Sequence, residues 1–176
     1  MDNTAIAKSE HHPYYAAYIA KSGEKELLAA MKESAEQVLA AWKAIPSTCS
    51  DLKYRDGSWT IAQLIQHVND GERIFAYRAC ALARGERQPL PGFEENEYAA
   101  AEISKNSSLA DRIEEFRLLR ASNILLFKGF TPEVLMNQGI VSNSNMSVRA
   151  IGRILIGHAV HHMEVVKERY APFWQK

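Results

Sequence analysis

The last long segment of the chain, residues 148–170, reads VRAIGRILIGHAVHHMEVVKERY. Its apolar side chains, Ile151 and Leu155 among them, recur at intervals of three and four, which is the period of an amphipathic α-helix. Ser147 stands where an N-cap belongs, and Pro172 follows the end of the segment. We therefore predict a helix here, with His158 and His162 on or beside its apolar face.

Three earlier segments have the same apolar period: residues 22–45, 60–84 and 109–127. Ser22 and one of Ser107 or Ser108 are candidate N-caps, while Pro46, Gly85 and Gly129 are stop signals. Four amphipathic helices of this length predict an all-α protein, a four-helix bundle that forms one domain over residues 22–172. Residues 1–21 are expected to form an N-terminal arm or a short helix.

Two long connections lie between the expected helices, at residues 88–106 and 131–146. A loop as long as the first is often functional in a compact domain. Neither connection shows a pattern that predicts a β-strand.

The charge of the chain is balanced, with 21 Lys and Arg against 21 Asp and Glu among 176 residues. Direct binding to nucleic acid is not indicated, because such proteins usually carry a basic excess or stripe. No apolar stretch is long enough for a membrane span, and no signal sequence precedes the first helix. We expect a cytoplasmic protein.

His158 and His162 are one helical turn apart, so their imidazoles can converge on one metal ion. Ala159 stands where an H-E-x-x-H protease has its glutamate, so that class is not indicated. His67 on the second helix supplies a third ring if the two helices face each other. The other interpretation is ordinary surface or hydrogen-bonded histidines, and His161 is an alternative ligand to His162.

Three imidazoles with open coordination positions form a site of the catalytic kind, which suits Zn²⁺, Ni²⁺ or Fe²⁺. Asp70, one turn after His67, is a candidate for a hydrogen-bond partner of a ligand or for a fourth ligand. We expect one divalent metal per chain.

Several motifs in fixed order give the chain a resemblance to a known family. They are Trp59-Thr60, His67 with Asp70 and Glu72, the run Pro89-Leu90-Pro91-Gly92-Phe93, Gly157-His158 with His161-His162, and Glu168-Arg169-Tyr170. Together they resemble the DinB-like superfamily, and more narrowly its DinB_2 branch, from about Tyr14 to Tyr170.

The resemblance implies an up-down-down-up bundle, often a homodimer, with a metal held by His67, His158 and His162. It also implies a small-molecule substrate, since the superfamily includes S-transferases that use bacillithiol, mycothiol or glutathione. The expected activity is therefore thiol transfer by a metal-activated thiolate. A hydrolase with metal-bound hydroxide and a non-catalytic, dimeric metal-binding module are the alternatives.

A thiol co-substrate of low molecular weight carries carboxylates, so a transferase should place a cation near the metal. Arg78, Arg149 and Arg153 are the candidates, although an ordinary solvated or salt-bridged arginine is the favoured interpretation of each. Glu72 could act as an acid or base if it pointed inward, but we expect it on the helix surface. The sequence alone names no catalytic residue.

Overall fold

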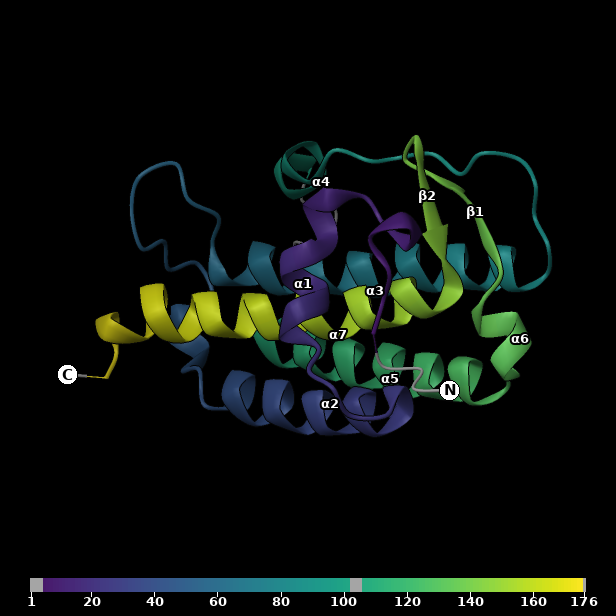
Figure 1. The fold of residues 1–176 in the computed structure, drawn as a ribbon. Helices are drawn as coiled ribbons and strands as arrows, with labels where there is room; N and C mark the ends of the chain where they lie inside the picture. The colour runs from purple at the N-terminus through teal and green to yellow at the C-terminus, as the bar shows by residue number, and fades with distance from the viewer. Residues whose placement is uncertain (1–4, 102–105, 176) are drawn as a thin grey trace.

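The computed structural model describes residues 5–101 and 106–175, and four long helices form its body. They are α2 (Leu27–Lys43), α3 (Ile61–Ala83), α5 (Leu109–Lys128) and α7 (Val148–Val165). In Figure 1, α2 and α7 run in one direction and α3 and α5 in the other, so the order is up-down-down-up. The predicted all-α four-helix bundle is confirmed.

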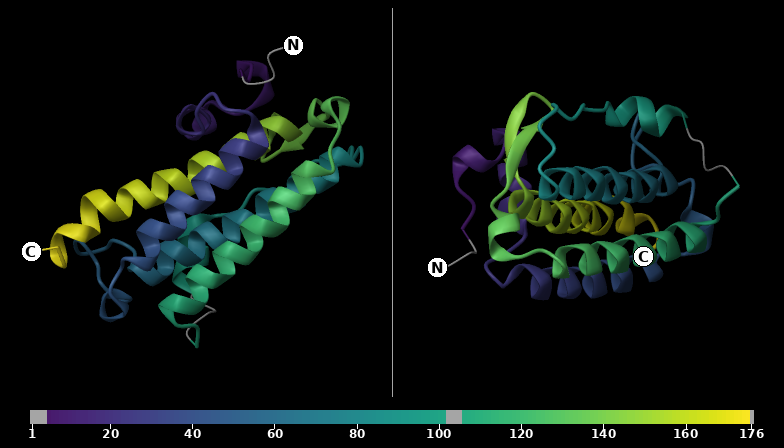
Figure 2. Two further views of the ribbon diagram at one scale, coloured as in Figure 1. Left: turned by 90° about the horizontal axis from the view of Figure 1, so that it is seen from below. Right: turned by 90° about the vertical axis from the view of Figure 1, so that its right-hand side faces the viewer.

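The connection between α3 and α5 follows from this order. Because these consecutive helices are parallel, the chain must return along the length of the bundle between them, and it carries α4 (Glu95–Ala101) on the way (Figure 1). Both α2 and α3 pack against α5 and against α7. Helices α3 and α7 are therefore neighbours, as a shared histidine site requires (Figure 2).

Two of the predicted N-caps are confirmed. Ser108 forms a capping box at α5, and the Ser147 hydroxyl accepts a hydrogen bond from the backbone N–H of Ala150 at α7. Thr60, which was not predicted as a cap, forms a capping box at α3. The predicted start at Ser22 is wrong, because α2 begins at Leu27 with Glu26 as its N-cap. Ser22 instead ends the preceding short helix.

The segment before α2 holds 3-10 helices at Lys8–Glu10 and Pro13–Tyr15, followed by α1 (Ala16–Lys21). Helix α1 packs across α7 (Figure 1). The approach is close at Gly157, where a Cβ would lie 1.7 Å from the Tyr18 carbonyl oxygen. Residues 1–4 of the expected arm and 102–105 of the expected loop lie outside the described residues.

The 131–146 connection departs from the prediction, because it contains α6 (Pro132–Leu135) and a β-hairpin. The hairpin pairs β1 (Gln138–Val141) with β2 (Ser144–Ser147). Ser142 and Asn143 form its two-residue turn with φ of 49° and 61°, the left-handed conformation that such turns require. The two strands read QGIV and SNMS, which do not alternate apolar and polar residues, so the sequence lacks the pattern that predicts a strand.

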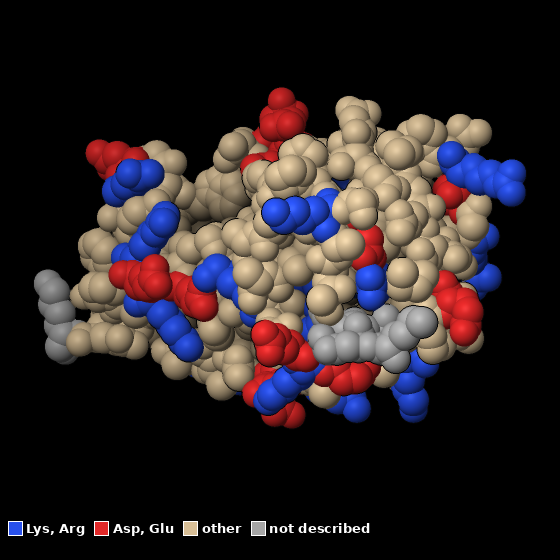
Figure 3. All heavy atoms as spheres, viewed as in Figure 1, with Lys and Arg blue, Asp and Glu red and all other residues tan. Residues whose placement is uncertain are grey.

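The remaining short elements are a 3-10 helix at Ser47–Cys49, a π-helical turn at Val166–Tyr170 that continues α7, and a 3-10 helix at Ala171–Phe173. No helix in the described part of the chain has the length and apolar character to cross a bilayer. Basic and acidic side chains are interspersed over the face seen in Figure 3.

A layer of polar side chains divides the hydrophobic core into two apolar clusters. One cluster includes Met31, Phe75 and Ile154, and the other includes Trp42 and Phe116. Every long helix contributes a buried polar residue between them: Ser34, Asn69, Glu72, Arg120, Asn123 and His158.

The buried carboxylate of Glu72 is the centre of this layer. It pairs with Arg120 and accepts a hydrogen bond from the Asn123 side chain at 2.8 Å. The expectation that Glu72 lies on the surface is therefore wrong. The counter-ion of Glu72 is on a different helix, α5, so the pairing cannot be read from the sequence.

Candidate metal centre

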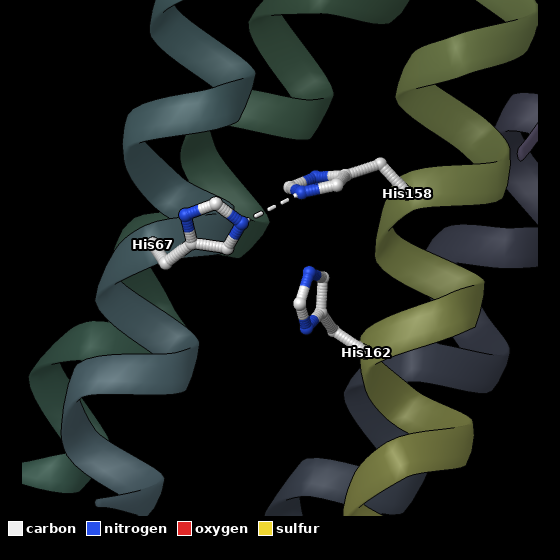
Figure 4. A group of neighbouring side chains, drawn as sticks. All are labelled: His67, His158 and His162. Carbon is white, nitrogen blue, oxygen red and sulfur yellow. Dashed lines mark hydrogen bonds between the residues drawn. The ribbon is translucent and has the colours of Figure 1, made fainter. Parts of the chain in front are cut away.

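Three histidines meet where α3 faces α7. His67 extends from α3 and His158 and His162 from α7, with their rings turned toward one another (Figure 4). One ring nitrogen from each lies within 4.8 Å of the others, and the Nε2 atoms of His67 and His158 are 2.9 Å apart. The structure thus brings together the three residues that the sequence suggested.

The position of His158 depends on a glycine in the facing helix. A Cβ on Gly71 would lie 2.9 Å from Cε1 and 3.1 Å from Nδ1 of the His158 ring. Aromatic rings also pack against the histidines. The ring centroids of Trp59 and His67 are 4.8 Å apart, and those of Tyr18 and His158 are 5.4 Å apart.

Burial keeps these imidazoles neutral. It lowers the pKa of His67 to about 4, with a nearby glutamate, Glu95, opposing the shift. It lowers the pKa of His158 and His162 well below the usual value, and the neighbouring imidazoles add to the effect. A neutral imidazole is the form that binds a metal ion.

The donor set fits a divalent metal. Both ring nitrogens of His162 are buried and have no hydrogen-bond partner among the described residues. Unpaired buried polar atoms are costly, and a metal ion would use one of these nitrogens. Metal–nitrogen bonds of about 2.0–2.1 Å are within reach of all three rings after small side-chain adjustments.

Asp70 does not join this cluster. Its carboxylate accepts a hydrogen bond from Gln66 at 3.0 Å and lies 3.8 Å from the Arg73 guanidinium, both on α3. Burial raises its pKa. The other candidate, His161, packs its ring 5.0 Å from His162 and 5.4 Å from Tyr18 and also stays outside the cluster.

A cavity of about 720 Å³ opens onto the three histidines. This volume is in the range of small-molecule sites. Its walls are largely aromatic and come from four parts of the chain: Tyr14, Tyr15 and Tyr18 from the N-terminal segment, Trp59 before α3, Phe75 within α3, and Phe93 from the long connection.

The three candidate arginines have different surroundings. Arg78 borders the cavity and is 2% exposed. Arg149 instead pairs with Glu10, with Nε–Oε2 and Nη2–Oε1 distances of 2.7 and 2.6 Å, and so ties the N-terminal segment to α7. Arg153 donates to the carbonyl oxygens of Gly23 and Lys25 before α2.

The sequence did not place the N-terminal tyrosines or Trp59 at the site. One signal was available, because Tyr14, Tyr15 and Tyr18 cluster at helical spacing in the segment before the first predicted helix. Such a cluster needs a surface to cover. Only the packing of α1 on α7 identifies that surface as the wall beside His158.

Comparison with known proteins agrees with this architecture. The model of the DinB superfamily, in its DinB_2 form, matches residues 30–166. The chain belongs to the DinB superfamily. The matched region includes all three clustered histidines of this family member.

Two further proteins are similar to this DinB-superfamily chain. YfiT from Bacillus subtilis, described as a probable metal-dependent hydrolase with an unusual four-helix bundle topology, superposes with a TM-score of 0.74. That match covers 96% of this chain and 93% of YfiT at 16% identity, so it shows a shared fold.

A Geobacillus thermodenitrificans (strain NG80-2) protein named "Putative metal-dependent hydrolase" is 31% identical over 75 residues. The match covers 43% of this chain and 42% of that relative, less than half of either protein.

Proposed function

We propose that this protein is a metal-dependent enzyme in which His67, His158 and His162 hold one divalent ion beside a small-molecule cavity. The observation that carries the proposal is the convergence of three neutral imidazoles, with His158 and His162 buried and His67 partly buried, at the wall of an aromatic cavity. Three protein ligands leave coordination positions for a reactant, which distinguishes a catalytic site from a closed structural one.

When bound, such a metal lowers the pKa of a coordinated thiol or water and supplies a nucleophile at neutral pH. The residues of the chain position the other reactant. Tyr18, Trp59 and Phe75 offer apolar surface for its body and keep water from the histidines.

Thiol transfer is the reaction that we propose. A low-molecular-weight thiol loses its proton to solvent, its sulfur forms a bond to an electrophilic carbon, and the leaving group departs with the electron pair of the broken bond. Such a step needs no strong general acid when the leaving group is stable. This suits a histidine cluster that includes no carboxylate among the described residues.

Hydrolysis is the second candidate, because both similar proteins are named as metal-dependent hydrolases. In that reaction water adds its hydroxyl to the electrophilic centre and its proton to the leaving group. Glu94 and Glu95 border the cavity, and Glu95, which acts electrostatically on His67, is the carboxylate that we propose for proton transfer.

We also propose a homodimer. Leu118 and Leu125 are seven residues apart on α5 and are 54% and 68% exposed. Apolar side chains on one helix face suit an interface with a second copy. Sedimentation equilibrium should give twice 19.8 kDa, whereas the single-chain mass contradicts the dimer.

The metal proposal is tested by elemental analysis of tag-free protein reconstituted with Zn²⁺, Ni²⁺ or Fe²⁺. We expect about one ion per chain in the wild type and a loss in His158→Ala. His161→Ala is the matched control, because it removes a neighbouring imidazole outside the cluster. No metal in the wild type, or full occupancy in His158→Ala, would contradict the proposal.

The reaction is tested on the metal-loaded protein with two kinds of substrate. Formation of a thioether from 1-chloro-2,4-dinitrobenzene and glutathione, bacillithiol or mycothiol supports transfer. Release of nitrophenol from nitrophenyl esters without a thiol supports hydrolysis. In either case the activity should be lost in His67→Ala and retained in His161→Ala.

A further inference from the structure

The cavity holds a second polar feature besides the histidines, on the same side of α3. Arg78 lies 11 residues after His67 on this helix and borders the same cavity. We infer that Arg78 forms an anion site that binds a carboxylate of the substrate while the reacting group lies at the histidines. This inference rests on the proposed function, since it takes this cavity as the substrate site.

The guanidinium of Arg78 lies beside the Tyr15 phenol and is held by two oxygen atoms from other parts of the chain. Its Nη2 atom donates to the Pro91 carbonyl oxygen at 2.7 Å and to the Ser142 hydroxyl at 3.2 Å. These partners come from the long connection and from the hairpin turn. They fix the plane of the guanidinium and join both loops to α3.

The second terminal nitrogen of the guanidinium, Nη1, is an unused donor. Nη1 of Arg78 is buried and has no hydrogen-bond partner among the described residues. A buried donor without a partner destabilises the folded protein. A carboxylate in the cavity would satisfy this donor once the side chains that cover Nη1 move aside, and it would neutralise the charge.

No protein carboxylate already does so within the described ranges. Arg120 pairs with Glu72 and Arg149 with Glu10, but no salt bridge is formed by Arg78. Glu94 and Glu95 border the cavity from the α4 side, and neither bonds to Arg78. A built cationic group without its counter-ion, facing a cavity, is the arrangement expected of an anion site.

Aromatic rings link the anion site to the histidines. The Arg78 guanidinium carbon lies 5.4 Å from the Phe75 ring centroid and 5.9 Å from that of Phe93. The Phe75 ring in turn lies 6.2 Å from the His158 ring. A flat or apolar body that bridges the two polar ends would lie against Phe75.

Tyr15 adds a neutral donor at this end of the cavity. Burial raises the pKa of its phenol, and the adjacent Arg78 opposes the shift. The phenol therefore keeps its proton at neutral pH. The substrate class that fits is an anionic molecule with an aromatic or apolar body, such as an aryl or alkyl carboxylate with its reactive group at the other end.

The test compares two probes that differ in one charge, 4-(mercaptomethyl)benzoate and 4-(mercaptomethyl)benzamide, by isothermal titration calorimetry on the metal-loaded protein. We expect the benzoate to bind at least tenfold more tightly. Arg78→Met should abolish this preference without weakening the amide. Arg78→Lys should retain part of it, because a point charge replaces the planar fork.

Arg153→Met is the matched control, since it removes another arginine that is 2% exposed and is bonded to two carbonyl oxygens outside the cavity. It should retain the full preference. Equal affinities of the two probes in the wild type would overturn the anion site. So would a preference that persists in Arg78→Met, or no binding of either probe at millimolar concentration.

The same titrations on metal-free His67→Ala separate this inference from the proposed function. Recognition of the carboxylate needs no metal, so the benzoate preference should persist there. If the wild type binds no metal but the preference remains, the metal proposal fails and the anion site stands. If metal binds but the preference is absent, the anion site alone fails.

Discussion

Replacing Gly71 with alanine should weaken metal binding without unfolding the bundle. The new Cβ would lie 2.9 Å from Cε1 of His158, whereas carbon atoms in ordinary contact are about 3.5–4.0 Å apart. The His158 ring must therefore move by roughly 0.5 Å, which is about the tolerance of a preorganised site. We expect the dissociation constant for the metal to rise about 10–100-fold, as for other changes that misplace a ligand.

The free energy of unfolding should change much less. Alanine favours a helix over glycine by about 0.8–1 kcal/mol, and this offsets part of the roughly 1–3 kcal/mol cost of overpacking. Competition with a chromophoric chelator measures the affinity, and urea unfolding of the metal-free protein measures stability. Gly129→Ala is the control, because the nearest atom to its Cβ is 3.4 Å away and far from the histidines. A folded Gly71→Ala protein with unchanged metal affinity would refute the reasoning.

Three further predictions concern stability. Burial lowers the pKa of His67 from 6.5 to about 4, so the unfolded chain binds the proton first as the pH falls. The metal-free protein should therefore lose stability as the pH falls from about 6.5 to 4. At pH 5 the loss from this ring alone should be about 2 kcal/mol. A urea midpoint that does not depend on pH would contradict this prediction. Glu72→Ala should cost about 3–5 kcal/mol in urea unfolding because it leaves the buried charge of Arg120 unpaired. Glu114→Ala, at an exposed ion pair, should leave the urea midpoint nearly unchanged. Glu10→Ala removes the ion pair that joins the N-terminal segment to α7. Limited proteolysis should therefore cleave that segment faster than in the wild type, while the bundle unfolds at the same urea concentration. Equal cleavage rates would show that the ion pair does not hold the segment.

The candidate metal site was predictable because much of it is local. His158 and His162 share a face through helical geometry alone, whatever the rest of the chain does. His67 needed one further assumption, that α3 and α7 are neighbours in the bundle. The resemblance to a known family supplied that assumption, and the structure agrees with it.

The role of each arginine was not predictable. Arg78, Arg149 and Arg153 have similar sequence surroundings, on apolar helices that carry few charges. Only one borders the cavity, because the partners of the other two come from the N-terminal segment and from the start of α2. Such contacts between distant segments leave no trace in helical periodicity.

The long helices, two of their caps and the spacing of two histidines follow from interactions within a few residues, so the amino-acid order is enough to predict them. Only the packing of the helices shows which buried charges are paired and which one borders a cavity without a counter-ion among the described residues. Glu72 is neutralised by Arg120 from another helix, whereas Arg78 retains an unused donor beside the aromatic rings. The physical reason is that the cost of a buried charge depends on what lies opposite it, and this is fixed only when the helices pack.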